Sequence, residues 1–457
     1  MRPSPPDCPI PGATGMCSPE GTGSIGVLIL GEALGEAEAN DGLPFRPYAQ
    51  AGSLLERAIR RAGFDRRQFV LWNTVPVRPP NNYLEGAPYE AAAVAWGIPQ
   101  LHEIVRQYKP RCILALGGIA LRAVSGLVGD YRSVSHLRGF VLPSNNMEGI
   151  PVVGTFHPAF LRRGAMPLFS VLMHDLKLAV AVAACSPAAG SGHLFDLQRP
   201  GRPSEPEIRH KSPVDQPCPL RAETTSPRLA GDLDVVGEKN GRTAQRTTFF
   251  SPVLYRDFEW SSAYGPPLDM TNPIVPSGYI THPGEGDAWD FLRRAKDDPR
   301  QLITYDIETP RSAVTTEDES DELADTDILS IQLSLAVGTG IFLPWRPPYT
   351  EVARLVLALP NAKAGANTWR FDDPLLRAHG CQLNGTLHDA RWAWHHLQPD
   401  LRAGLQFIAS FYPVAGLPHV PWKHLHASHP EYYGIMDVDV LQRIFHVGIC
   451  GAWHGTV

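Results

Sequence analysis

The chain has 457 residues, 43% of them hydrophobic, and a formal net charge of −6, which is enough sequence for two globular domains. The bulk charge does not indicate a nucleic-acid-binding protein, although residues 1–185 are slightly basic and the remainder is acidic. The seven cysteines are scattered and no secretory signal precedes them, which argues against a protein stabilised by disulfides. The longest apolar stretch, near Leu176–Cys185, is too short to cross a bilayer. We therefore expect a cytoplasmic protein.

Residues 1–185 alternate short apolar runs with helical segments. A Ser53–Glu56 capping box predicts the start of one helix, and a second helix is expected over Ala91–Tyr108. An alternation of buried strands and helices predicts a three-layer α/β/α domain with a parallel sheet. The runs typical of such strands are 25–30, 69–75, 112–117 and 151–156.

Polar side chains follow three of these strands. Glu32 and Glu38 follow the first, Asn73 ends the second and His157 ends the fourth. Because the carboxyl ends of parallel strands meet at one edge of a sheet, we expect one pocket there. The residue types suit recognition and release of a nucleobase: an amide that pairs with a pyrimidine, an imidazole that stabilises the departing base and a carboxylate that activates water. Further candidates are Phe45 for stacking, Phe160 or Leu161 as an apolar wedge, and Arg162 and Arg163 for phosphates.

Residues 31–45, 72–82 and 155–163 resemble the three motifs of uracil-DNA glycosylases, most closely the iron–sulfur type usually found in prokaryotes. The resemblance implies hydrolysis of the N-glycosidic bond of deoxyuridine in DNA, with Glu32 activating water and Glu38 as a second carboxylate. It further implies that Asn73 pairs with uracil and that His157 stabilises the leaving group. That family binds its cluster with four cysteines, and one of these positions is Val77 here, so we expect no iron–sulfur cluster.

A change of composition separates this domain from a second one. Residues 186–267 are rich in proline and lack an apolar period, which predicts a flexible linker. Residues 268–457 follow as the second domain. There we expect a strand over 303–308, a hairpin that turns near Gly338–Gly340, a helix over Glu351–Leu359 and a strand over 362–367. This order predicts an α/β domain with a mixed sheet.

The second domain contains carboxylates at spacings that bring them together. Asp306 and Glu308 lie two apart on a strand and so share a face, Asp372 begins a helix, and Tyr433 and Asp437 lie four apart on one helix face. Neighbouring carboxylates repel unless a cation lies between them, and oxygen ligands suit Mg²⁺ or Mn²⁺. We expect two such ions, held for phosphodiester hydrolysis by Asp306, Glu308, Asp372 and Asp437, with Tyr433 orienting the attacking water.

These segments resemble the DEDD exonucleases of the tyrosine subtype, as in the proofreading domains of family A DNA polymerases, over about residues 274–445. The resemblance implies a ribonuclease H-like fold and 3′→5′ removal of nucleotides from DNA, with Asn367 near the substrate. It favours Asp389 as a helix cap rather than a ligand. A polymerase domain often follows such an exonuclease, so a DNA polymerase is a candidate partner. A free-standing module, a longer chain and an RNA substrate all stay open.

The two halves together predict a DNA-repair or replication-editing enzyme whose first domain releases uracil from DNA and whose second trims 3′ ends. An alternative stays open for the first domain. Leu34, Ala39 and the missing cluster ligands depart from the family pattern. These departures favour a non-catalytic module that reads uracil or another base and positions the exonuclease or a partner polymerase.

Overall fold

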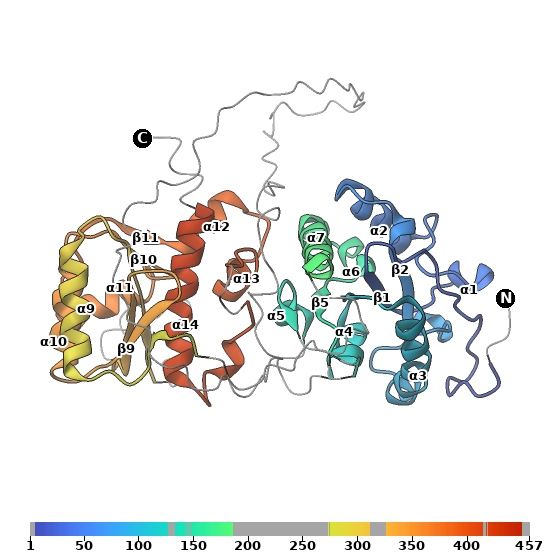
Figure 1. Ribbon diagram of the computed structural model, residues 1–457, viewed down its shortest axis with the longest axis horizontal. Coiled ribbons are helices and arrows are strands. Elements are labelled where there is room, and N and C mark those ends of the chain that lie inside the picture. The colour runs from blue at the N-terminus through green and yellow to red at the C-terminus, as the bar shows by residue number, and fades with distance from the viewer. Residues whose placement is uncertain are drawn as a thin grey trace, which may run out of the picture. The chain divides into compact units, whose positions relative to one another are not determined.

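The computed structural model (Figure 1) describes residues 5–126, 133–142, 144, 146–147, 149–185, 273, 275–310, 326–414, 417 and 419–449. The predicted linker, 186–267, lies outside the described residues, so the proposed domain boundaries stay predictions. The described residues form two α/β domains, which confirms the predicted fold class.

The N-terminal domain is built on a five-stranded sheet with the order β2-β1-β3-β5-β4. Four strands are parallel, as predicted, and the very short β4 pairs antiparallel with β5 at one edge. The apolar runs form strands because nearly every side chain in them is buried. The strands are β1 (Val27–Ala33), β2 (Val70–Val75), β3 (Cys112–Leu116), β4 (Val141–Leu142) and β5 (Val152–Thr155).

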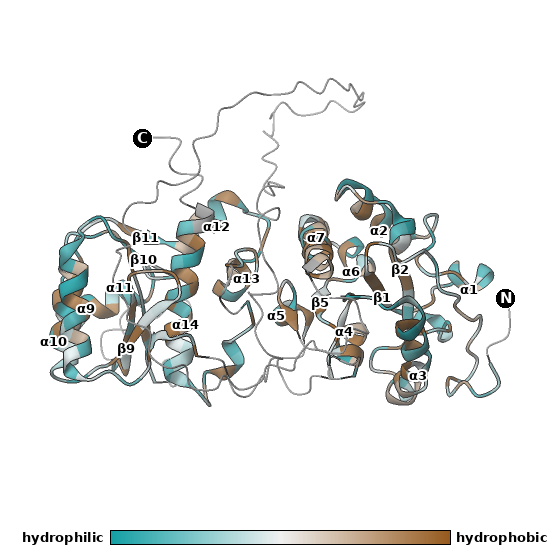
Figure 2. Cartoon of the chain, viewed as in Figure 1, coloured by the Kyte–Doolittle hydropathy of each residue, from teal (hydrophilic) through white to brown (hydrophobic). Residues whose placement is uncertain are grey.

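Helices cover both faces of this sheet, which confirms the three layers. Helix α7 packs on β3 and β5 with α2 against it, while α3 packs on β2 and α4 on the central strands from the opposite face (Figure 1). Figure 2 shows the strands as the most hydrophobic layer, between helices that are polar on their outer sides. The helices are α1 (Glu38–Asp41), α2 (Gln50–Arg61), η1 (Arg66–Gln68), η2 (Pro80–Asn82), α3 (Glu90–Tyr108), α4 (Gly118–Ser125), α5 (Val134–Leu137), α6 (Pro158–Arg162), η3 (Met166–Leu168) and α7 (Phe169–Cys185).

Two expectations about helices were wrong. Helix α2 begins at Gln50, after the extended residue Ala49, and Ser53 lies inside it, where its hydroxyl donates to the Gln50 carbonyl instead of capping. The helical segment Met166–Ala184 has 19 residues and is long and apolar enough to cross a membrane, unlike the shorter apolar run expected. Its most apolar part is 61% buried and α7 packs on β3 and β5, as the core helix of a domain does.

The C-terminal domain contains a six-stranded sheet with the order β11-β10-β7-β8-β9-β6. Strand β8 is antiparallel to β7 and β9, and the other pairs are parallel, so the predicted mixed sheet is confirmed. The predicted hairpin joins β8 to β9, with Gly338 at a positive φ of 78° just before β9. The strands are β6 (Gly278–Ile280), β7 (Ile303–Glu308), β8 (Ser330–Ser334), β9 (Thr339–Pro344), β10 (Lys363–Gly365) and β11 (Leu387–Asp389).

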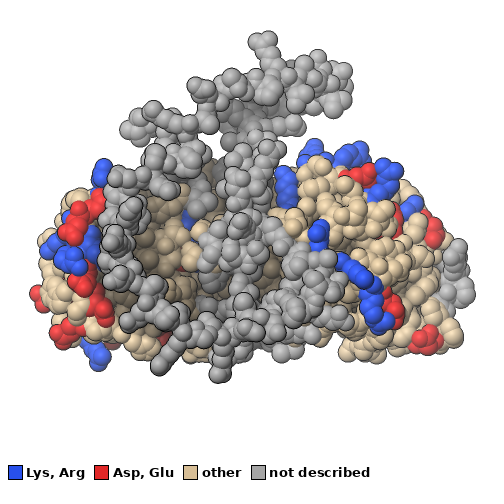
Figure 3. All heavy atoms as spheres, in the orientation of Figure 1, with Lys and Arg blue, Asp and Glu red and all other residues tan. Residues whose placement is uncertain are grey.

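Helix α14 packs on one face of this sheet, across β7, β8 and β9, while α9 and α10 pack together on the other (Figure 1). Over α9 and α10 the acidic and basic side chains are mixed (Figure 3), which is typical of a solvated surface. The helices are α9 (Glu285–Asp297), α10 (Tyr349–Leu357), α11 (Asp372–Ala378), α12 (Ala390–Leu397), α13 (Leu405–Ala409), η6 (Lys423–Leu425), α14 (Pro430–Arg443) and η7 (Ile444–Ile449).

Candidate functional sites

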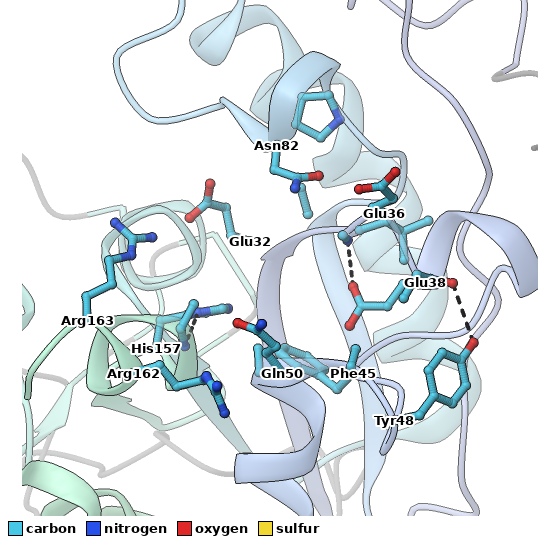
Figure 4. A pocket seen from close by; sticks show the side chains of 18 residues that line it. Glu32, Glu36, Glu38, Phe45, Tyr48, Gln50, Asn82, His157, Arg162 and Arg163 are labelled. Carbon is cyan, nitrogen blue, oxygen red and sulfur yellow. Dashed lines mark hydrogen bonds between the residues drawn. The ribbon is translucent and has the colours of Figure 1, made fainter. Parts of the chain in front are cut away.

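A cavity of about 870 Å³ opens at the carboxyl edge of the N-terminal sheet. Figure 4 shows side chains from β1, from the loop after it and from α6 turned toward this space. The structure therefore brings together most of the residues that the sequence placed at this edge. The predicted residues that line the cavity are Glu32, Glu38, Phe45, His157, Arg162 and Arg163.

His157 precedes helix α6 and is held in one protonation form. Its Nδ1 accepts the backbone N–H of Ala159 at 3.2 Å, so in the neutral ring the proton lies on Nε2. Burial, with a smaller contribution from the nearby Arg163, lowers the pKa of His157 to about 4. At neutral pH the imidazole is therefore an uncharged hydrogen-bond donor at the cavity wall.

Glu32 lies at the end of β1, half-buried beside the same cavity. Burial raises its pKa to about 7, and the negative charges of Glu85 and Glu90 raise it too. The guanidinium groups of Arg122 and Arg163 act in the opposite direction. A carboxyl group that titrates near neutral pH can accept a proton from water, which is the property a general base requires.

Phe45, Asn73 and Gly31 meet beneath the cavity. The Phe45 ring lies 6.0 Å from the His157 ring, and Phe45 has a left-handed φ of 49°, which non-glycine residues rarely adopt. A Cβ added to Gly31 would collide with both the Asn73 amide and the Phe45 ring, so these two side chains approach over the glycine. Asn73 is buried there and does not line the open cavity. The sequence had predicted that it contacts the base directly.

Glu38 holds the loop that carries Phe45. Its Oε2 accepts the backbone N–H of Gly35 at 2.6 Å. Burial raises the pKa of Glu38, while hydrogen bonds from the backbone N–H groups of Gly35, Arg46 and Phe45 lower it. A carboxylate that accepts from three backbone donors shapes the pocket wall, whereas Glu32 and the exposed Glu36 also line the cavity.

The predicted wedge residues on α6 differ in exposure. Phe160 is 43% exposed and stacks on Phe156 at 5.7 Å, so its ring is available at the surface. Leu161 is fully buried, and the prediction that it could serve as a wedge was wrong. Adjacent residues on a helix point in different directions, and here Leu161 points into the core while Phe160 faces solvent.

Sequence reasoning missed several lining residues. The side chains of Tyr48, Gln50 and Asn82 also face the cavity (Figure 4). Gln50 begins α2 and Asn82 ends η2, and neither belongs to a strand end. A search for polar residues at strand ends could not find them. Both amides can donate and accept hydrogen bonds, so they are candidates for contacts with a polar ligand.

The second candidate site lies on β7 and α14. Ligand oxygens of Asp306, Glu308 and Asp437 lie within 4.8 Å of one another. Burial raises the pKa of Asp306 well above its usual range, and the charges of Asp437, Asp372 and Glu308 raise it further. Burial and then Asp437 raise the pKa of Glu308 as well. Three oxygen donors crowded in this way fit a divalent cation such as Mg²⁺ or Mn²⁺.

Asp372 begins α11, as predicted, but lies outside this close triad. Its pKa is raised to about 8, mainly by burial and then by the negative charge of Asp373. A hydrogen bond from the Ile307 backbone N–H acts in the opposite direction and lowers the pKa. Because Ile307 separates Asp306 from Glu308, the Asp372 carboxyl borders the triad. It is placed to complete a ligand set rather than to form its centre.

Two basic side chains reach the triad from the segment before α14. The Lys423 ammonium donates to both Asp437 oxygens, at 2.8 and 2.7 Å, and to the Tyr433 hydroxyl at 2.7 Å. His426 Nε2 lies 3.3 Å from a Glu308 oxygen. Tyr433 and Asp437 share one face of α14, as predicted. Nothing in the spacing of the carboxylates indicated Lys423 or His426.

Asp389 caps helix α12, as predicted. Its Oδ1 accepts the backbone N–H groups of Arg391 and Trp392, at 2.9 and 3.2 Å. Asn367, at a positive φ of 67°, accepts a hydrogen bond from the Arg391 guanidinium at 3.0 Å. Asn367 thus lies beside α12 rather than inside the triad.

The model of the uracil DNA glycosylase superfamily matches residues 19–177. A type-4 uracil-DNA glycosylase from Thermotoga maritima is 32% identical over 161 residues, which are 35% of this chain and 79% of that protein. The chain belongs to the uracil-DNA glycosylase superfamily. A second type-4 uracil-DNA glycosylase, from Pyrobaculum aerophilum, is 38% identical over 147 residues, or 32% of this chain and 71% of that protein.

Solved structures with nuclease titles align with part of the chain at low similarity. One described as the apo form of a nuclease has a TM-score of 0.24 and 18% identity, covering 38% of this chain and 83% of that one. An EXD2 exonuclease domain soaked in Mn and GMP has a TM-score of 0.19 and 16% identity, covering 39% of this chain and 94% of that one. TM-scores this low do not establish a shared fold.

The described residues of this superfamily member do not fit a four-thiolate iron–sulfur cluster. Val77 occupies one expected ligand position and is fully buried in an apolar cluster with Val75 and Ile10. Cys8 packs beside this cluster, and the buried Cys17 thiol contacts the Asn73 amide at 3.9 Å. Burial raises the pKa of both thiols, which disfavours the thiolate that metal binding needs. Apolar side chains therefore surround Val77, the position at which the resemblance implied a cluster ligand.

Proposed function

We propose that the N-terminal domain hydrolyses the N-glycosidic bond of uracil in DNA. The observation that carries this proposal is the cavity in which Glu32, Phe45 and His157 converge from separate segments. Superfamily membership and two type-4 uracil-DNA glycosylase relatives support it. Different residues in this cavity then bind the base, stabilise it as it leaves and activate the attacking water.

His157 stabilises the leaving group. The flipped base stacks against Phe45, which places a pyrimidine oxygen toward the imidazole. As the bond between the base and the sugar C1′ breaks, its electron pair moves onto the base and negative charge grows on that oxygen. The Nε2–H of neutral His157 donates to it, and because backbone contacts fix the ring, the donor needs no reorganisation.

Glu32 activates the attacking water. In its deprotonated form the carboxylate accepts a proton as the water oxygen bonds to C1′. With a pKa of about 7, Glu32 is deprotonated in roughly half of the molecules at neutral pH. The same high pKa makes it a stronger base than an ordinary solvated glutamate.

An assay with a uracil-containing oligonucleotide tests this proposal. We expect the parent protein to release uracil, and Glu32→Ala and His157→Ala each to lose at least about 100-fold of that activity. Glu103→Ala, a change on the exposed face of α3, serves as the control. Binding of the uracil strand without base release by the parent would instead favour the base-reading module.

For the C-terminal domain we propose metal-dependent hydrolysis of phosphodiester bonds at the 3′ ends of DNA strands. The acidic triad of Asp306, Glu308 and Asp437 is the observation that supports it. These residues, with Asp372 beside them, would hold Mg²⁺ or Mn²⁺. A bound ion would lower the pKa of an attacking water and neutralise charge on the phosphate.

The chain's own residues then bind and orient the substrate. The Tyr433 hydroxyl, whose pKa burial keeps above its usual range, stays protonated and can position a water by hydrogen bonding. A cation held by Asp437 would compete with the Lys423 ammonium, which contacts both oxygens of that carboxylate. The ammonium could then also donate to a phosphate oxygen of the substrate.

Incubation of a 5′-labelled single strand with Mg²⁺ tests this second proposal. We expect stepwise shortening from the 3′ end that stops when the metal is chelated. Shortening from the 5′ end, or at the same rate in chelator, would refute the assignment.

A further inference from the structure

Two tryptophans form a stacked pair beside the acidic triad. Trp369, in the segment between β10 and α11, is 50% exposed, although a large apolar ring in water is unfavourable. Its ring lies 6.1 Å from that of Trp392 on α12, with 25° between the planes. One face of the pair is therefore internal and the other is open to a planar ligand.

The pair is held in place by hydrogen bonds around a single carboxylate. Asp389 Oδ1 caps the helix that carries Trp392, and Oδ2 accepts from the Trp369 backbone N–H at 3.4 Å and from the Thr368 hydroxyl at 3.3 Å. The Arg391 guanidinium joins the two segments again through Asn367. Because these bonds hold the backbone segments that carry both tryptophans, ligand binding requires less ordering of the chain.

Basic side chains surround the pair. The Arg370 guanidinium lies 5.9 Å from the centre of the Trp392 ring, and Arg391, His395 and His396 follow on the exposed side of α12. Flat rings flanked by cations match the two surfaces of a nucleic-acid strand, its bases and its phosphates.

The position of the pair links it to the triad. Trp369 lies three residues before Asp372, the carboxyl that borders Asp306 and Glu308. A strand with its terminal phosphodiester at the triad can therefore extend over Trp369. In a duplex both faces of an internal base are covered by neighbouring pairs, so the open ring selects unpaired bases.

We propose that Trp369, stacked on Trp392 and flanked by Arg370 and Arg391, binds single-stranded nucleic acid by stacking with its bases. This inference rests on the proposed nuclease function for its purpose, but the binding itself requires no catalysis. DNA and RNA strands share the chemistry that the pair recognises, and the experiment below separates them.

Binding of labelled oligothymidylate, oligouridylate and a blunt hairpin duplex to the full chain, measured by fluorescence anisotropy in chelator, tests the proposal. We expect the single strands to bind more tightly than the duplex, and Trp369→Ala to weaken single-strand binding about fivefold or more. Trp369→Phe should restore most of the affinity, because it keeps a stacking ring. Trp289→Ala, at a tryptophan 40% exposed on α9, is the matched control and should bind as the parent does.

The outcomes distinguish this inference from the proposed function. Equal affinity of Trp369→Ala and the parent, or tighter binding of the duplex, would overturn the stacking role even if the nuclease is active. Loss in Trp369→Ala that Trp369→Phe rescues would uphold it even if no nuclease activity is found. A larger loss with one of the two strands identifies DNA or RNA as the preferred ligand.

Discussion

Both domains contain partly buried carboxylates, but the neighbouring charges that act on these carboxylates differ between the two domains. In the N-terminal cavity burial and the charges of two glutamates raise the pKa of Glu32, two arginines lower it, and the result is about 7. In the C-terminal domain Asp306, Glu308 and Asp437 crowd together, and the pKa of Asp306 rises well above its usual range. Lys423 and His426 offset only part of that charge.

The difference teaches that the surroundings of a carboxylate decide its use. A single group with balanced neighbours exchanges one proton near neutral pH, which suits water activation. A crowded set cannot release all its protons unless a cation replaces them, which suits metal binding. The following four predictions test this contrast, in order of decreasing effect.

The largest effect is expected from removing one charge of the triad. Asp306→Asn should reduce 3′ trimming at least about 1,000-fold, because a cation loses a central ligand. Uracil release should not change, and the exposed Asp290→Asn on α9 should affect neither activity. Rates on labelled strands measure both. A variant that trims DNA normally would contradict the metal assignment.

The pH dependence of uracil release comes next. A base works only when deprotonated, so kcat/KM should rise about tenfold per pH unit below the Glu32 pKa of about 7 and level off above it. Glu32→Gln should lower the rate about 100-fold and abolish the rise. His157 stays neutral throughout this range, because its pKa is about 4. A profile that falls as pH increases through 7 would exclude Glu32 as the base.

A smaller effect is expected at Lys423. Its ammonium competes with a cation for Asp437, so Lys423→Met should tighten Mn²⁺ binding about two- to fivefold, the range of a partly exposed ion pair. Electron paramagnetic resonance of free Mn²⁺ measures this affinity without turnover. Lys423→Arg keeps the charge and is the control. Weaker Mn²⁺ binding in the methionine variant would show that the ammonium supports the ion instead.

No effect at all is expected from chelation on the first domain. Neither the cavity residues nor the apolar cluster around Val77 offers a complete metal ligand set among the described residues. Uracil release in excess chelator should equal that in Mg²⁺, and elemental analysis of the purified protein should find no stoichiometric iron. Iron at a stoichiometry near four per chain would require ligands beyond those inferred here.

Much of the fold followed from the sequence because its signals are local. Buried parallel strands appear as apolar runs, so β1, β2, β3 and β5 were predicted within a few residues. Strand β4 was missed because two residues carry no pattern. Ser53 was mistaken for a cap because the motif occurs by chance within a helix that already begins at Gln50.

The candidate sites were predicted where residues sit at strand or helix ends or share one face of a single element, as Asp306 and Glu308 do on β7. Glu32, His157 and Asp372 occupy such ends, and the structure places each beside the expected cavity or triad. The contacts of Lys423 and the burial of Leu161 depend on how distant segments pack. No spacing in the sequence reports that packing, so these features emerge only in three dimensions.

Gly31 has a consequence for any redesign of the base that we propose the N-terminal cavity binds. Because Gly31 has no side chain, the Phe45 ring and the Asn73 amide can both approach its Cα. No space is left at Gly31 for a larger side chain. Even alanine there would displace one or both partners. Selectivity for a larger or differently substituted base must therefore be engineered in the walls, at Gln50 and Asn82, where amides face open space.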